Sequence, residues 1–163
     1  MSDKLQAQLN TIAHNLASTK ALKEAGEYVR SAAVLLAPAE SGHLRQNIYL
    51  QIDEDREGQT AEIYTNVSYA RYVELGTGPK GAANHAGISP EVDPVYTTKP
   101  WYIHKSQVDA RLAEKYGWPM RGDFYICSGS KAHPFMYPAL KDNRQTVLNI
   151  LRDGYAEAIR KAK

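Results

Sequence analysis

The chain has 163 residues and a mass of 18.2 kDa, which is the usual size of one domain. Hydrophobic residues make up 43% and charged residues 23%, so the composition is that of a globular protein and not of a disordered one. Twenty basic and eighteen acidic side chains give a formal net charge of +2, which argues against a protein whose main task is to grip a phosphate backbone. A single cysteine excludes an internal disulfide, and without an apolar run of membrane-spanning length we expect a soluble protein made inside the cell.

Residues 3–37 are predicted to be helical, because apolar side chains recur there at steps of three and four. The stripe is formed by Leu5, Leu9, Ile12 and Leu16 and then by Leu22, Ala25, Val29, Ala33 and Leu36. Ser18 and Thr19 interrupt it, so the pattern leaves open whether this is one bent helix or two. Pro38 ends the helical stretch, since proline cannot continue the hydrogen bonds.

The next segment changes to the period of a strand. Apolar residues occupy the even positions Leu44, Ile48, Leu50 and Ile52, and after a polar turn at 53–59 they occupy the odd positions Ala61, Ile63, Thr65 and Val67. This alternation predicts an antiparallel hairpin, followed by a short helical turn within 68–75.

Residues 79–120 are predicted to be a long insertion with little periodicity. Its one periodic part is a predicted short helix that begins at Ser106, where residues 106–109 resemble a capping box. This helix would bury Val108, Leu112 and Tyr116. Beyond it, residues 124–127 are predicted to be a strand that returns to the sheet, and a long amphipathic helix with Pro138 in its first turn runs to the end of the chain. The order of elements indicates an α+β fold, with residues 1–163 forming a single domain.

No motif indicates catalysis, a metal or a cofactor. Residues 76–81 match the pattern G-x-G-x-x-G, but a helical turn precedes them where a dinucleotide site requires a strand. The five histidines lack metal-ligand spacing. Cys127 and His133 leave a small Cys/His hydrolase as one alternative, and the basic C-terminal end leaves a nucleic-acid-binding adaptor as another, although acidic residues lie among those charges.

Three strings in the sequence are similar to the signatures of one family. Residues 37–48 read APAESGHLRQNI, residues 69–78 read YARYVELGTG, and residues 132–140 read AHPFMYPAL, and they occur in the order of that family. The chain thereby resembles the siphophage tail-completion, or tail-to-head joining, proteins over about residues 1–78 and 121–160.

The resemblance implies a virion protein without enzymatic activity, present in the host cytoplasm during assembly. Such a protein forms a homo-oligomeric ring, expected to be a hexamer, at the head-proximal end of the tail tube, and it docks onto a neck or stopper protein below the portal. DNA passes through the ring without sequence-specific binding, and no membrane takes part.

Eight residues are candidates for contacts between subunits or with neighbouring virion proteins. Arg45 and Glu74 are candidates for a charge pair within or between subunits, and the backbone at Gly76 and Gly78 is expected to permit the close approach of a neighbour. The remaining candidates are aromatic, namely Trp101, Tyr102, Trp118 and Phe135. We expect the insertion to pack against an adjacent subunit, the tail tube or a neck protein, with the two tryptophans as anchors; the alternative is a lid on the chain's own sheet.

The core is predicted to consist of apolar residues on the inner faces of these elements. They are Leu5, Leu9, Ile12, Val29, Leu44, Ile48, Ile63, Val73, Leu148 and Leu151.

Overall fold

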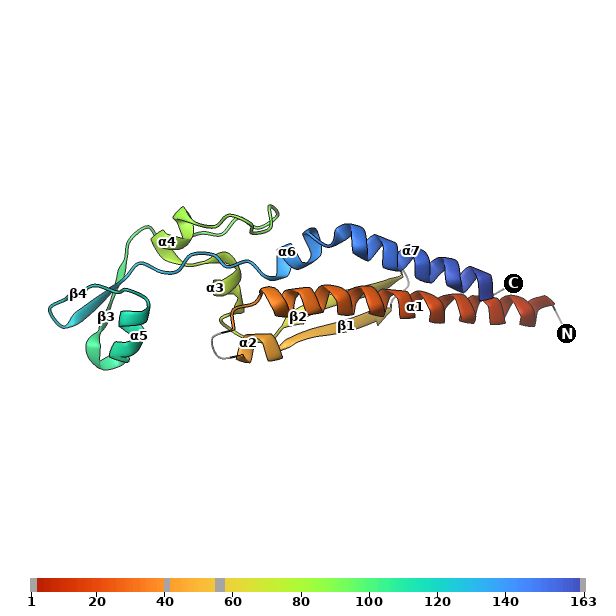
Figure 1. The fold of residues 1–163 in the computed structure, drawn as a ribbon, viewed down its shortest axis with the longest axis horizontal. Coiled ribbons are helices and arrows are strands. Elements are labelled where there is room, and N and C mark those ends of the chain that lie inside the picture. The colour runs from red at the N-terminus through yellow and green to blue at the C-terminus, as the bar shows by residue number, and fades with distance from the viewer. Residues whose placement is uncertain (1–2, 40–41, 55–57, 162–163) are drawn as a thin grey trace. The chain divides into compact units, whose positions relative to one another are not determined.

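The computed structural model describes residues 3–39, 42–54 and 58–161, and the side chains of these residues except for 3–17 and 161. The fold is α+β, as the sequence predicts (Figure 1). Backbone contacts divide the chain into two compact units: unit 1 comprises Met1–Val67 and Pro138–Lys163, and unit 2 comprises Ser68–Tyr137. The sequence did not predict this division. The expectation that residues 1–163 form a single domain stays a prediction.

Unit 1 is organised around one long helix. Helix α1 (Asp3–Leu36) runs through Ser18 and Thr19 as a single element of 34 residues, which decides the question that the sequence left open. The last helix, α7 (Arg144–Lys161), runs antiparallel to α1 on one side, and the hairpin of β1 (Ile48–Glu54) and β2 (Gln59–Thr65) lies on the other (Figure 1).

Small residues allow these layers to approach closely. The buried face of α1 includes alanines at Ala21, Ala25 and Ala33 with Val29 among them, and the same step of four leads to the buried Ala37 just after the helix. A Cβ atom on Gly154 of α7 would collide with the Cβ atom of Ala21, and one on Gly26 would lie 2.6 Å from Leu50 of the hairpin. Helix α1 is therefore tightly packed on two sides through backbone and methyl groups, and large side chains are not needed there.

The hairpin is regular, and its register runs without a bulge from Ile48 opposite Thr65 to Glu54 opposite Gln59. The prediction that strand structure begins at Leu44 is wrong, because residues His43–Gln46 form the short helix α2 and the strand begins at Ile48. Leu44 is nevertheless buried, on the short helix α2. Residues 55–57 of the predicted turn lie outside the described residues.

Unit 2 has a sheet of its own. It begins with helices α3 (Ala70–Leu75) and α4 (Gly78–Ala83), and α3 confirms the predicted helical turn. An irregular stretch then leads to β3 (Trp101–His104), a 3-10 turn η1 (Lys105–Gln107), α5 (Ala110–Lys115), β4 (Met120–Arg121) and β5 (Phe124–Cys127). The strand order is β3-β5-β4, so the expectation that residues 124–127 return to the hairpin sheet is wrong. Strand β3 and the first residue of β4 come from the predicted insertion, and both strands pair with β5 instead.

Two predicted helices differ from those observed. The helix expected from Ser106 is capped by Asp109, whose carboxylate accepts from Arg111 N–H at 2.8 Å, and it buries Ala113 while Leu112 and Tyr116 are exposed. The C-terminal helix is divided into α6 (Met136–Lys141) and α7, with residues 142–143 forming a turn between them.

The predicted core is confirmed at Val29, Leu44 and Ile48, which are all buried. It is wrong at Leu148, which is 49% exposed, because α7 approaches α1 at Gly154 instead. Ile63, Val73 and Leu151 are half-buried, and the side chains of Leu5, Leu9 and Ile12 lie outside those described. Across the described ranges, none of the helices combines the length and the apolar character that crossing a membrane requires.

Candidate functional site

The site lies in unit 2, where the G-T-G sequence at 76–78 is clamped against residues 128–132. Thr77 N–H donates to Ser130 C=O at 2.9 Å, and Ser130 N–H donates back to Thr77 C=O at 3.1 Å. Gly76 has φ 75°, and a Cβ atom there would lie 2.6 Å from Ala132 N, so only glycine fits. The neighbour that approaches these glycines is therefore a segment of the same chain, which gives them a structural task besides the intersubunit contact predicted for Gly76 and Gly78.

Glu74 joins two of the signature strings. Its carboxylate accepts three backbone N–H groups, from Phe135 at 2.7 Å, Met136 at 3.0 Å and Tyr137 at 3.1 Å. These N–H groups lie at the start of α6 and have no acceptor within that helix. A carboxylate at this position satisfies them and interacts favourably with the helix dipole, so Glu74 acts as a long-range cap.

Arg45 has a comparable task in unit 1. Its Nε donates to Ala37 C=O at 2.7 Å and its Nη2 to Leu35 C=O at 3.2 Å, at the C-terminal end of α1. Both charged candidates thus bind the backbone at helix ends, each within its own unit. Their pairing with each other, within or between subunits, stays a prediction.

An apolar groove of about 530 Å³ opens beside the G-T-G segment. It is lined by Arg71, Tyr72, Leu75, Gly76, Thr77, Gly78, Pro94, Val95, Tyr96, Thr97 and Trp101. Three of the eight predicted interface residues, Gly76, Gly78 and Trp101, line this groove. Val95 is 99% exposed at its rim, and Tyr72 is exposed as well, with the Arg71 guanidinium 4.7 Å from its ring.

Tyr96 holds the irregular stretch against α3. Its hydroxyl donates to Leu75 C=O at 2.7 Å, and its ring stacks on His85 with centroids 5.7 Å apart. Burial of the phenol raises the pKa of Tyr96 above its usual value near 10. Sequence reasoning missed Tyr96 and Val95, because this stretch has no periodicity that distinguishes an anchoring side chain from an exposed one.

Trp101 belongs both to the groove and to the three-stranded sheet. It faces Gly78, where a Cβ atom would lie 2.8 Å from its ring, and it pairs with Cys127 across β3 and β5. Tyr102 is 57% exposed, whereas Trp118 is half-buried and stacks on Tyr116. Tyr102 is thus the most accessible of the three aromatic candidates on the insertion.

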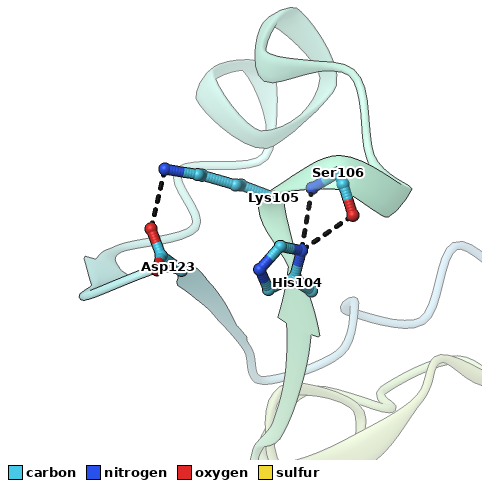
Figure 2. A network of polar contacts seen from close by, with 4 residues as sticks. All are labelled: His104, Lys105, Ser106 and Asp123. Carbon is cyan, nitrogen blue, oxygen red and sulfur yellow. Dashed lines mark hydrogen bonds and ion pairs between the residues drawn. The ribbon is translucent and has the colours of Figure 1, made fainter.

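The far end of this sheet is held by a small polar network (Figure 2). Lys105 Nζ lies 2.7 Å from an Asp123 carboxylate oxygen, while Ser106 N–H donates to His104 Nδ1 at 3.2 Å. The ion pair is more than half exposed on both sides, so it contributes little stability. The ion pair joins the end of β3 to the turn between β4 and β5. The Nδ1 atom of His104 accepts the hydrogen bond from Ser106.

Two further residues singled out from the sequence, Phe135 and Cys127, are buried and form no functional site. Phe135 is fully buried, which makes it a core residue of the described chain and does not support its role in an interface. Cys127 is 3% exposed, so the thiol that the hydrolase alternative requires is not accessible to a substrate in this conformation. Among the residues that the structure describes, no cluster of three or more potential metal ligands occurs.

Comparison with protein families gives one match. Residues 1–76 match the model of a family described as "Bacteriophage HK97-gp10, putative tail-component". The matched residues are slightly fewer than half of the 163 in the chain. The match includes α1, α2, the hairpin and α3, and it ends within the G-T-G segment. No curated protein and no solved structure matches the chain.

The match confirms the tail-protein resemblance over these residues and indicates a component of a bacteriophage tail, and hence of the virion. A structural tail component also favours a protein that is not an enzyme and that contacts other tail proteins. Unit 2, which carries the groove and all four aromatic candidates, lies almost wholly beyond the matched residues.

Proposed function

We propose that the protein is a structural subunit that forms a ring, a hexamer by the resemblance, at the head-proximal end of a phage tail tube. In this position it completes the tail and joins it to the neck protein below the portal, and DNA passes through the ring without being read. The observation that carries the proposal is the family match of residues 1–76 together with the signature string at 132–140, which lies beyond it.

The surface of unit 2 supports a role in joining. The groove beside the G-T-G segment is mostly apolar, and Val95 is exposed at its rim; Tyr102, on strand β3 next to the groove-lining Trp101, exposes a second large apolar side chain. Exposed apolar groups of this kind are typical of surfaces that are buried in an assembly. The net charge of +2 favours contact with proteins over tight binding to DNA.

The test is complementation of a phage or prophage that lacks this gene. Val95→Asp and Tyr102→Asp, made separately, are expected to lower the yield of joined particles at least about tenfold, since each places a charge in an apolar contact. The melting temperature of the isolated subunit is expected to stay unchanged, because both side chains are exposed. Electron microscopy then counts tails without heads.

Val92→Asp is the matched control, since Val92 is exposed on the same stretch but does not line the groove. It is expected to support normal joining. Absence of the protein from purified tails would contradict the proposed function. Normal joining by the Val95→Asp variant would exclude the groove as a contact surface, and normal joining by the Tyr102→Asp variant would exclude the exposed face of β3. A salt-dependent affinity of the isolated subunit for DNA would favour the adaptor alternative instead.

A further inference from the structure

The hairpin of unit 1 has two open edges. Strands β1 and β2 are seven residues long and pair with each other but with no other strand that the structure describes. Each outer edge therefore presents a row of backbone N–H and C=O groups without a strand partner, which is the usual template for pairing with another chain.

Most of the usual devices against edge pairing are absent from these two strands, whose charged residues are the three acids Asp53, Glu54 and Glu62. Their sequences, IYLQIDE and QTAEIYT, contain no lysine, arginine, proline or glycine, and their register has no bulge. The sheet of unit 2 differs, because its outer strands β3 and β4 have only four and two residues. Short edges protect that sheet, whereas the hairpin is left long and regular.

We propose that β2 of one copy pairs with β1 of the next copy, so that the hairpins join into a continuous antiparallel sheet around the ring; this rests on the proposed ring. Rotation about a ring axis repeats the order β1-β2, which places each β2 beside the β1 of its neighbour with opposite direction. The occupant of each edge is therefore a second copy of this chain.

The register of the hairpin makes the two edges complementary. In an antiparallel pair, residues alternate between those whose backbone groups point inward to the partner and those whose groups point outward, and opposite residues share the same direction. If the neighbouring copies repeat the register that places Gln51 opposite Glu62, then outward groups of β1 meet outward groups of β2.

The side chains are compatible with this pairing. On the exposed face, Glu62 would again face Gln51, and Asp53 would face Thr60, so no two acids are directly opposite. On the inner face, Leu50 would face Ile63 of the next copy, which extends the apolar surface that α1 covers. The ring contact thus repeats pairs that the hairpin already forms.

Mixed single-cysteine variants test the pairing. Gln51→Cys and Glu62→Cys are prepared separately, with a tag on one, and are mixed and oxidised both as free protein and in assembled tails. We expect a mixed disulfide at least about tenfold more abundant than either homodimer, since directly opposite residues lie within reach of a disulfide. The buried native Cys127 is present in all samples, and unsubstituted protein controls for it.

Gln51→Cys mixed with Thr60→Cys is the matched register control, because these positions are diagonal in the proposed pairing and lie about 7–8 Å apart. A predominant Gln51→Cys homodimer would show a two-fold β1–β1 contact and overturn the proposal. So would the absence of cross-links above the control in both samples. If tails contain the protein but show no cross-link, the strand pairing is wrong and the proposed tail function stands. If free protein is cross-linked but never enters tails, the proposed tail function is wrong and the strand pairing stands.

Discussion

The two units are stabilised in different ways. Unit 1 relies on apolar packing, in which alanines and glycines bring α1 close to α7 and to the hairpin. Unit 2 relies more on backbone hydrogen bonds between distant segments and on one carboxylate that caps a helix. Its fully buried large side chain is that of Phe135, whose own N–H group is one of the three that Glu74 accepts. The comparison indicates that unit 1 is sensitive to changes in the size of its buried apolar residues, and unit 2 to changes in its backbone clamp.

The largest effect is expected for Gly129→Ala in unit 2. Gly129 has φ 81°, and a Cβ atom there would collide with the carbonyl oxygen of Thr77, which cannot move without breaking the clamp. We expect a loss of about 3 kcal/mol or more in the free energy of unfolding, measured by denaturant titration. Gly122→Ala, at φ 60° with open space around it, is the control and should cost only about 1 kcal/mol. Equal losses would mean that the clamp contributes nothing.

In unit 1, Leu44→Ala is expected to cost about 2–5 kcal/mol, because Leu44 is buried and its removal leaves a cavity. Leu148→Ala is the control, since the same substitution at a half-exposed position should cost less than about 1 kcal/mol. Chemical denaturation of the two variants measures the difference. A larger loss at Leu148 would show that the outer face of α7 is the true core.

Glu74→Gln tests the polar character of unit 2. The substitution keeps the size of the side chain but removes its charge and replaces one of the two oxygens that accept the three N–H groups. We therefore expect the free energy of unfolding to fall by about 2 kcal/mol. Hydrogen exchange at the amides of residues 135–137 should accelerate. Glu91→Gln, on an exposed part of the same unit, is expected to change neither quantity.

Gly154→Ala tests the close contact between α1 and α7. In an exposed helix this change stabilises, but here the added methyl group meets Ala21, so we expect a loss of about 1–3 kcal/mol. Ala156→Gly, exposed on the same helix, should cost only about 1 kcal/mol through helix propensity. Thermal unfolding of both variants measures these changes. A gain in stability for Gly154→Ala would contradict the close contact between α1 and α7.

The smallest effect is a pH dependence confined to unit 2. The pKa of Tyr96 is raised on folding, so its contribution to stability is fully present below its unfolded pKa near 10 and is lost as the pH rises through the folded value. Unfolding at increasing pH should therefore show a decline above about pH 10 that Tyr96→Phe reduces. Tyr102→Phe, at an exposed tyrosine, is the control and should leave the decline as it was.

The sequence by itself determined the elements whose periodicity is strong. The long helix, the alternation in the hairpin from Ile48 onward and the helical turn at 70–75 depend on local spacing and occur as predicted. Of the predicted stripe, Ala25, Val29 and Ala33 are buried and Leu36 is exposed. The three signature strings also indicate a tail protein, and the family match confirms this for residues 1–76.

Only the tertiary structure decided which partner each element has. Residues 124–127 read as a strand, but nothing in their pattern says that they pair with β3 and β4 and not with the hairpin. The apolar residues of α7 were assigned to the core, yet the helix packs through Gly154 and leaves Leu148 exposed, because close approach depends on small residues that a hydrophobic pattern ignores. The role of Glu74 depends on N–H groups 61 to 63 residues away, a distance over which spacing in the sequence carries no information.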